Sequence, residues 1–395
     1  HRDLHYPLRR QRQMCIRDRM KRVHIAVLCL FMLLPVSCGD SALKYYNLGV
    51  EAADRDDLDE AIRNWRRSAE INPSDPDTRY NLGMALLEKK EYGEAEENLK
   101  AAAGIDSDDY RLQYGLGKAL EMQGKYSQAK KAYRYSISLK SNFHPPYSGL
   151  GAIALKQELY STAEKYASDA LRYAPHDARA NLVLAEAYYM QQNYSAAYAQ
   201  LISMRAWLSA EPDYLLLLGK VMNSRHMYAD AIQTLITARE AGKSGSDLYL
   251  NLGTAYYETG DFKNAHENYR LAIYRDEQNV QAWTGLARTE FELDHLDESL
   301  KAWNRAKALD PADPEIDLGM AVTHIRSREF EKAVSVLEKL NAKGNAPPRT
   351  LYYLGHSYMR LGRTDDARKS FILFLDKWQG DETLSEEVRE ILVTL

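Results

Sequence analysis

Residues 246–279 read SDLYLNLGTAYYETGDFKNAHENYRLAIYRDEQN, and residues 280–313 read VQAWTGLARTEFELDHLDESLKAWNRAKALDPAD. Both stretches are 34 residues long and share one spacing of apolar and small residues. Leu252-Gly253 in the first corresponds to Leu286-Ala287 in the second, and Ala265 corresponds to Ser299. Self-similarity at a fixed period of roughly 20 to 50 residues is typical of repeat proteins, so the same period is expected elsewhere in the chain.

The pattern does recur at the same interval along most of the chain. Corresponding pairs are Leu48-Gly49, Leu82-Gly83, Leu116-Gly117, Leu150-Gly151, Leu184-Ala185, Leu218-Gly219, Leu252-Gly253, Leu286-Ala287, Met320-Ala321 and Leu354-Gly355. A second small residue follows each pair, 12 positions after the first. We therefore divide residues 42–381 into ten repeats without insertion: 42–75, 76–109, 110–143, 144–177, 178–211, 212–245, 246–279, 280–313, 314–347 and 348–381.

Each repeat has two helical faces. Positions 4, 7, 8 and 11 follow the i, i+3, i+4, i+7 spacing of one helix face, and positions 20, 24 and 27 form a second face. Gly124, Gly260 and Gly362 fall between the two, where a positive φ is expected. The small residues allow the two antiparallel helices to approach closely. One repeat cannot bury both faces alone, so stability is expected from contacts between neighbouring repeats.

These residues resemble the tetratricopeptide repeat, which has the pattern W-x2-L-G-x2-Y, then A-x3-F, then P. The resemblance covers residues 42–381, although the first Trp is kept only at Trp283. It implies an all-α fold, a right-handed α-α superhelix of about ten helix-turn-helix repeats, like those of bacterial envelope lipoproteins with this repeat. Residues 382–395 carry one amphipathic stripe and are predicted to be a C-terminal capping helix, the alternative being a chain truncated at its end.

The first 37 residues differ in charge from the rest. They carry eight basic and two acidic residues, whereas the remainder carries 44 basic and 54 acidic ones. Met20, Lys21 and Arg22 precede an apolar run at 23–36, which is shorter than the roughly 20 residues that span a bilayer. This order is typical of a secretory signal peptide, here residues 20–37. Residues 1–19 are interpreted as a non-native upstream segment, the alternative being a basic cytoplasmic tail.

Cys38 follows the apolar run in the stretch LPVSC at 34–38. This stretch resembles a bacterial lipobox, although Pro35 stands where that pattern prefers Leu. The resemblance implies that Cys38 is acylated and becomes the new N-terminus, with residues 38–41 as a short tether. Gly39 in the second position favours the outer membrane, facing the periplasm, over the inner membrane. Plain secretion after cleavage and an uncleaved segment are the alternatives.

Composition and motifs leave little room for catalysis. The net charge of −4 excludes a broadly basic nucleic-acid binder, and three cysteines cannot build a disulfide scaffold. The sequence has no G-x-x-x-x-G-K-[ST] or H-E-x-x-H motif and no cysteine after Cys38. We therefore predict that the chain is not an enzyme, needs no cofactor, holds no metal and binds no nucleic acid.

In tetratricopeptide arrays the first helices line a concave groove through repeat positions 2, 5, 9 and 12. Here the resemblance implies a groove of aromatic and basic side chains. Rigid aromatics bind at low entropy cost, and Arg forms strong bonds with carboxylates. The predicted partner-binding residues are Tyr46, Tyr80, Arg111, Tyr114, Lys118, Arg179, Tyr189, Lys220, Tyr257, Arg288, Phe291, Arg349 and Tyr352. The alternative is that the tyrosines at position 5 pack half-buried between neighbouring first helices.

Three hypotheses on function follow. The leading one is a non-catalytic protein–protein interaction scaffold of a bacterial cell envelope, tethered to the membrane by acylated Cys38 and binding envelope proteins or peptides in the groove. The alternative is a polysaccharide-binding or export adaptor lipoprotein with Tyr and Trp as sugar platforms. An enzyme, or the regulatory arm of one, is opposed by the short stretch of fourteen residues after the array.

Overall fold

The computed structural model describes residues 38–344 and 346–395. These residues form 22 α-helices and no strand, which confirms the predicted all-α class. The chain divides into two compact units, an N-terminal unit that ends at Asp108 and a C-terminal unit of residues 109–395, and each is described by itself. Within the described residues, every helix is too short or too polar to cross a membrane.

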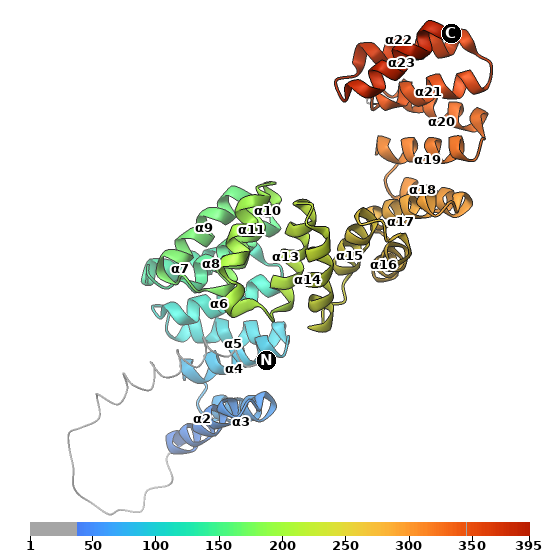
Figure 1. Cartoon of the computed structure of the whole chain (residues 1–395). Coiled ribbons are helices and arrows are strands. Elements are labelled where there is room, and N and C mark those ends of the chain that lie inside the picture. Colours follow the sequence, from blue (N-terminus) through green and yellow to red (C-terminus); the bar gives the residue numbers. More distant parts are fainter. Residues whose placement is uncertain (1–37, 345) are drawn as a thin grey trace, which may run out of the picture. The chain divides into compact units, whose positions relative to one another are not determined.

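The helices follow one another along the chain in antiparallel pairs. The N-terminal unit holds α2 (Cys38–Asp54), α3 (Leu58–Ile71), α4 (Pro76–Glu88) and α5 (Tyr92–Ile105). The C-terminal unit holds α6 (Tyr110–Met122), α7 (Tyr126–Leu139), α8 (Pro145–Lys156), α9 (Tyr160–Tyr173), α10 (Ala178–Met190), α11 (Tyr194–Ser203), α12 (Arg205–Leu208), α13 (Pro212–Ser224), α14 (Tyr228–Glu240), α15 (Ser246–Glu258), α16 (Phe262–Arg275), α17 (Val280–Glu292), α18 (Leu296–Leu309), α19 (Pro314–Arg326), α20 (Phe330–Ala342), α21 (Arg349–Arg360), α22 (Thr364–Lys377) and α23 (Glu382–Thr394). Within this unit each second helix packs on its own first helix and on the first helix of the next pair (Figure 1).

The two helices of a repeat meet where a small residue on the first faces a large residue on the second. A Cβ atom added to Gly117 would lie 2.6 Å from the ring of Tyr133, which is fully buried. The next repeat closes the other side of that ring, because Gly149 also lies against it. The same arrangement recurs at Gly253, Tyr269 and Gly285. Because a larger side chain would overlap the ring, the repeated small residue sets the distance between the helices.

Position 15 of every repeat lies in the turn between the two helices and has a left-handed backbone. Gly124, Gly260 and Gly362 have φ values of 72°, 78° and 72° there, which confirms the predicted positive φ. The other seven repeats place a side chain at this position with φ between 58° and 68°: Asp56, Lys90, Glu158, Gln192, His226, Asp294 and Arg328. A side chain in this region costs about 1 kcal/mol, so these turns are locally strained.

The fifth repeat departs from the uniform two-helix pattern. Its second helix, α11, ends at Ser203, and the short helix α12 follows after Met204. The same position is Ala170 in the fourth repeat and Ala238 in the sixth, both fully buried. Met204 is also fully buried, in the core cluster that contains Tyr214. The predicted continuous second helix is therefore broken in this repeat, whereas α20 and α22 run through the large residues Leu340 and Phe374 at the same position.

The ends of the array show two further features. Residues 38–41, predicted to be a tether, are helical and belong to α2, while the predicted segments 1–19 and 20–37 lie outside the described residues. At the other end α23 packs against the core through the predicted stripe, with Val388 fully buried and Leu384, Ile391, Leu392 and Leu395 partly buried. The predicted capping helix is therefore present.

Candidate functional site

The first helices of the C-terminal unit form one side of the stack. Successive first helices contact one another directly, from α6 and α8 to α19 and α21. Among the described residues no comparable contact joins successive second helices. The stack therefore curves toward its first helices, and we call the exposed sides of α6, α8, α10, α13, α15, α17, α19 and α21 the inner face.

The predicted groove residues all lie on first helices. Arg288 and Arg349 are exposed on the C-terminal unit, and the other members there are half-buried: Arg111, Tyr114, Lys118, Arg179, Tyr189, Lys220, Tyr257, Phe291 and Tyr352. Tyr46 and Tyr80 are half-buried on the N-terminal unit, where Asn81 donates a hydrogen bond to the Tyr46 hydroxyl at 3.3 Å. Both the binding role and the packing role of the tyrosines stay open.

An ionic network occupies the inner face between α6 and α10. Tyr133 donates its hydroxyl hydrogen to Glu121 Oε2 at 2.5 Å, and Arg179 donates to Glu121 Oε1. Only 8% of the Glu121 side chain is exposed, against 33% for Arg179. Burial opposes the charge of Arg179, but the attraction of Glu121 raises the pKa of the guanidinium. Burial also raises the pKa of Tyr114 to about 12. A ligand carboxylate would have to compete with Glu121 for Arg179.

A second buried carboxylate links α8 to α10. Asp177 caps α10 by accepting a hydrogen bond from the backbone of Ala180 at 3.1 Å, and the Ser148 hydroxyl donates to it at 2.8 Å. Nδ1 of His144 lies 2.7 Å from the same carboxylate oxygen. Burial acts against ionisation, but these hydrogen bonds outweigh it and lower the pKa of Asp177. Both buried carboxylates between α6 and α10, Glu121 and Asp177, are thus bound by side chains of the same unit.

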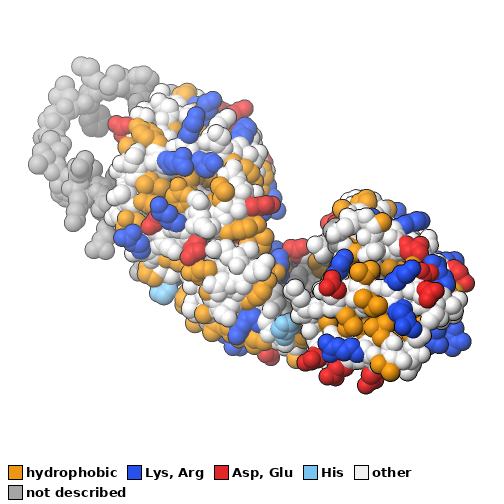
Figure 2. Space-filling view, turned by 90° about the horizontal axis from the view of Figure 1, so that it is seen from above, with side chains coloured by type: hydrophobic (Ala, Val, Ile, Leu, Met, Phe, Trp, Pro, Cys, Tyr) orange, Lys and Arg blue, Asp and Glu red, His pale blue; other side chains and the backbone are white. Residues whose placement is uncertain are grey.

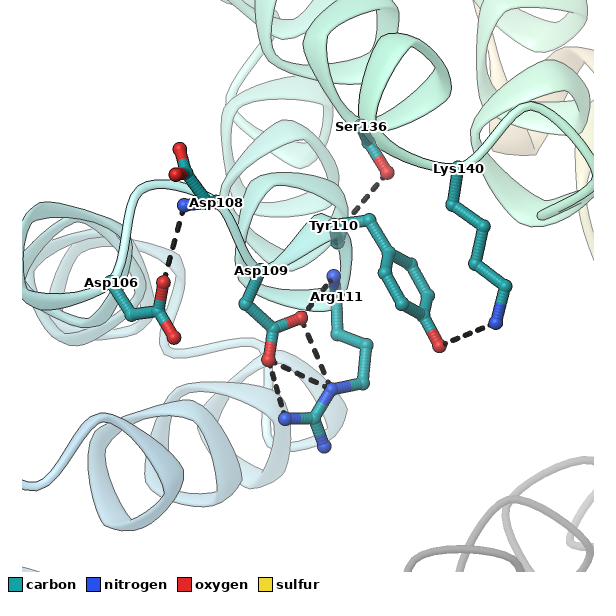
Figure 3. A network of polar contacts seen from close by, with 7 residues as sticks. All are labelled: Asp106, Asp108, Asp109, Tyr110, Arg111, Ser136 and Lys140. Atoms are coloured by element: carbon teal, nitrogen blue, oxygen red, sulfur yellow. Dashed lines mark hydrogen bonds and ion pairs between the residues drawn. The ribbon is translucent and has the colours of Figure 1, made fainter.

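Arg111 is likewise engaged by its own chain, as Figure 3 shows. Its Nε donates to Asp109 Oδ2 at 3.0 Å, and its backbone N–H donates to Asp109 Oδ1 at 2.7 Å. Beside it, Lys140 donates to the Tyr110 hydroxyl at 3.0 Å and lies 4.3 Å from that ring's centroid. Ser136 fixes the start of α6 by donating to the Tyr110 carbonyl at 2.7 Å. These contacts hold Arg111 at the N-terminus of α6.

Further along, three predicted rings pair with cations, of which Lys220 and Arg288 were predicted and Arg326 was not. Lys220 lies 5.6 Å over Tyr189, Arg288 lies 4.5 Å over Tyr257, and Arg326 lies 4.5 Å over Phe291. In each pair the ring is at position 12 of one repeat and the cation comes from the next repeat. Such pairs contribute about 0.5–1 kcal/mol at exposed sites. They orient the cations along the inner face, where Arg326 also pairs with Asp294 at 3.1 Å and Lys220 lies 3.4 Å from Asp247.

The last predicted residues lie at the end of the array. Arg349 is 3.6 Å from a carboxylate oxygen of Glu315. Tyr352 donates to Glu387 of α23 at 3.0 Å, and burial together with that carboxylate raises the pKa of Tyr352 to about 12. His356 of α21 is 3.5 Å from the same carboxylate, and burial lowers the pKa of this imidazole. Tyr352 therefore faces the capping helix.

A cleft of about 690 Å³ opens on the inner face. It is lined by α15, by α17 and by the turns that lead into α17 and α19. Arg288 is the basic residue in its wall, and hydroxyl and amide groups such as Thr254, Thr284 and Gln281 add polar surface. Five carboxylates also line it: Asp247, Glu258, Asp276, Asp310 and Asp313. The geometry suits a polar, extended ligand that carries positive charge.

The predicted site residues are aromatic and basic, and they do not include these carboxylates. Asp276 and Asp310 sit at the same position of consecutive repeats, in turns where aspartate is usually interpreted as a cap. Both do cap their turns, since their carboxylates accept backbone hydrogen bonds from Gln278 and Ala312. Their recurrence at one repeat position, together with Asp247 at position 2, was the available signal.

The described residues offer no sign of a metal centre. Within residues 38–344 and 346–395, no group of three or more His, Cys, Asp and Glu side chains is arranged to hold an ion. On the face shown in Figure 2, basic and acidic side chains are interspersed among hydrophobic ones. Among the described residues, the inner-face cleft is the candidate site considered below.

Comparison with protein families agrees with the helical pairs. Models of the tetratricopeptide repeat match residues 46–110, 111–138, 154–221, 222–280, 250–314 and 348–369. The chain belongs to the tetratricopeptide repeat family. Its resemblance to envelope lipoproteins of this kind stays a prediction.

Two curated relatives of this tetratricopeptide repeat chain are similar over part of its length. The TPR repeat-containing protein YpiA of Bacillus subtilis (strain 168) is 23% identical over 141 residues, which are 36% of this chain and 33% of YpiA. Superkiller protein 3 of Schizosaccharomyces pombe (strain 972 / ATCC 24843) is 28% identical over 120 residues, which are 30% of this chain and 9% of that protein. The chain thus spans a third of the length of YpiA and less than a tenth of the length of Superkiller protein 3.

Solved structures of tetratricopeptide repeat proteins are also similar. A tetratricopeptide repeat protein from Parabacteroides merdae ATCC 43184 has a TM-score of 0.49 at 14% identity, covering 64% of this chain and 99% of that one. YrrB, whose structure is described as a TPR protein with an unusual peptide-binding site, has a TM-score of 0.38 at 22% identity, covering 44% of this chain and 90% of its own.

Proposed function

We propose that the chain is a scaffold that binds protein partners on the inner face of its C-terminal unit. The observation that carries this proposal is the open cleft on α15 and α17, in a family whose members are generally non-catalytic scaffolds. The buried contacts between neighbouring helices hold the face rigid, so a partner segment meets a preformed surface. The bound partner would be a protein segment and not a reacting substrate.

A photocrosslinking experiment tests this proposal. Thr284→p-benzoylphenylalanine places a crosslinker in the cleft wall, and Tyr274→p-benzoylphenylalanine places one on α16, where the native side chain is 79% exposed. We expect protein adducts from Thr284 in cells that produce the full chain, with few from Tyr274. Adducts that form equally from both positions, or only from Tyr274, would contradict the proposal.

We further propose that acylated Cys38 tethers the scaffold to a bacterial envelope, with the outer membrane favoured. Support comes from the lipobox-like stretch, and Cys38 lies in α2, which is the first helix of the first repeat. A helix rises about 1.5 Å per residue, so the first repeat would lie close to the lipid headgroups. Several acyl chains hold a protein on a membrane stably, whereas one does so only marginally.

The tether is tested by Cys38→Ala and membrane fractionation. We expect the variant to move from the membrane to the soluble fraction. Cys29→Ala is the matched control, because it removes a cysteine from the apolar run and leaves the proposed lipid attachment intact. If Cys38→Ala stays with the membrane as the unchanged chain does, the tether is absent.

Polysaccharide binding is a second candidate, favoured by exposed aromatic rings at the turns before α10 and α13. Tyr173 is 46% exposed beside Tyr147, with ring centroids 5.9 Å apart, and Trp207 is 38% exposed beside His176 at 4.9 Å. Exposed rings of this kind are suited to stacking on sugars. Binding of acidic and neutral polysaccharides that is lost in Trp207→Ala, while crosslinking from the Thr284 position continues, would establish this second surface.

A further inference from the structure

We propose that the cleft on α15 and α17 accepts an extended, lysine- or arginine-rich segment of a partner protein. This inference rests on the proposed function and specifies the chemistry of the partner. The cleft wall carries five carboxylates against the single guanidinium of Arg288. A charge imbalance of this kind inside a hollow favours a cationic occupant, because the concave wall concentrates the field.

The carboxylates of the cleft are poorly compensated by the chain itself. Asp247 is 3.4 Å from Lys220 and 62% of its side chain is exposed. Asp276, Asp310 and Asp313 accept hydrogen bonds from neutral backbone N–H groups in their own turns. Among the described residues Glu258 forms no ion pair and lies exposed at the end of α15. Their negative charge is therefore available to a ligand.

Buried carboxylates elsewhere along the first-helix side have cationic or hydrogen-bonding partners. Glu121 is bound by Arg179, and Asp177 is bound by His144 and Ser148. Near the cleft, Asp317 lies 2.7 Å from Lys307 and 2.9 Å from Lys343. The carboxylates of the cleft thus differ from these three, which are bound by cations or hydrogen-bond donors of the chain itself.

The repeat sets a spacing for the ligand. Asp276 precedes α17 and Asp310 precedes α19 at the same repeat position. The axes of packed helices lie about 8–10 Å apart, and an extended peptide covers about 10 Å in three residues. A segment with basic residues three positions apart would therefore place one beside each turn. The Arg288 guanidinium lies 4.5 Å over the Tyr257 ring, so the basic residue of the wall is held on a ring.

The test measures binding of three labelled 12-residue peptides to the full chain by fluorescence anisotropy at low salt. One peptide has Lys at every third position among Gly, Ser and Ala, and the other two carry Glu or Gln in place of Lys. We expect the Lys peptide to bind and the Glu peptide not to bind. Binding should weaken steeply with added salt, because the contacts are between exposed charges.

The matched variants are Asp276→Asn/Asp310→Asn and Asp230→Asn/Glu240→Gln. Asn keeps an acceptor for the backbone hydrogen bonds of both turns, so the first pair should fold. The second pair removes two exposed carboxylates from α14, away from the cleft wall. We expect the Kd for the Lys peptide to rise about tenfold or more for the first pair and less than about twofold for the second.

Other results separate the two proposals. If the Gln peptide binds as tightly as the Lys peptide, or if both double variants weaken binding equally, the inference on charge is wrong while binding on the inner face stands. If none of the peptides binds and the Thr284 crosslinker yields no adduct, the inference and the proposed function fail together.

Discussion

Two regions of the inner face use the same repeat positions in opposite ways. Between α6 and α10, Glu121 at position 12 and Arg179 at position 2 bind each other, and the Tyr133 ring beneath them is fixed by its hydroxyl. Between α15 and α19, position 12 holds Tyr257 and position 2 holds Asp247, and a cleft of about 690 Å³ remains open. We call these the closed region and the open region.

The difference shows that the repeat position sets the location of a side chain on the inner face, but not the interactions that the side chain makes. In the closed region opposite charges are within reach across the array, so they contribute to stability. In the open region the available cation, Arg288, lies over a ring, and the carboxylates face the hollow. We therefore expect a binding site on such a scaffold where charged side chains at repeat positions lack an oppositely charged side chain of the chain itself.

Removing the Arg179–Glu121 ion pair of the closed region should lower the free energy of unfolding more than any other change considered. Arg179→Met leaves the buried Glu121 carboxylate with the Tyr133 hydroxyl and without its cation. Removing one member of a buried pair costs about 3 kcal/mol or more. Urea unfolding followed by circular dichroism should show this loss, whereas Asp276→Asn in the open region should change stability by less than about 0.5 kcal/mol. Equal effects at both sites would remove the distinction between the regions.

Adding one methyl group at equivalent positions sharpens the comparison. Gly149 and Gly285 both lie against a tyrosine ring of the preceding repeat. Tyr133 is held by its bond to Glu121, whereas Tyr269 has only a 3.3 Å contact with Thr254 beside the cleft. Gly149→Ala should therefore cost about 2 kcal/mol and Gly285→Ala about 1 kcal/mol. Thermal unfolding of the two variants checks the order, and a larger cost at Gly285 would show that the open region is packed as tightly.

The closed region should also respond to acid. The pKa of Asp177 is lowered in the folded chain, so folding is favoured by its ionised form and that contribution is present at neutral pH. It is lost as the pH falls from the ordinary value near 3.8 through the lower value of the folded state. Asp177→Asn should therefore reduce the loss of stability on acidification below about pH 4. An unchanged acid profile would mean that the hydrogen bonds from His144 and Ser148 do not favour the charged form.

The smallest effect is expected at the turns. Glu158 in the closed region and Asp294 in the open region have left-handed backbones, with φ of 59° and 64°. Gly removes the strain but adds freedom to the unfolded chain, so Glu158→Gly should stabilise by less than about 1 kcal/mol. Asp tolerates this conformation better, so Asp294→Gly should gain less. Differential scanning calorimetry of both variants checks the order, and a loss at Glu158 would show that its side chain has a stabilising contact.

The sequence predicts much of the fold, because the 34-residue period directly encodes which residues are small and which are large at the helix contacts. Gly117 and Tyr133 illustrate this, since their positions in the repeat alone place them against each other. The break at Met204 was not predictable, because the 34-residue period continues through it without a change. For the candidate site, the position of a residue in its repeat predicts whether it lies on the inner face. It does not predict which side chains from different repeats pair with each other. Arg179 and Glu121 are 58 residues apart, and only the packing of α6, α8 and α10 brings them together.

Hydrogen–deuterium exchange of the full chain with and without the Lys peptide tests the central claim most directly. We expect slower exchange on binding in α15, in α17 and in the turns at 276–279 and 310–313, with no change between α6 and α10. Slower exchange confined to α6–α10, or spread evenly over second helices, would contradict the claim that the open region of the inner face is the binding surface.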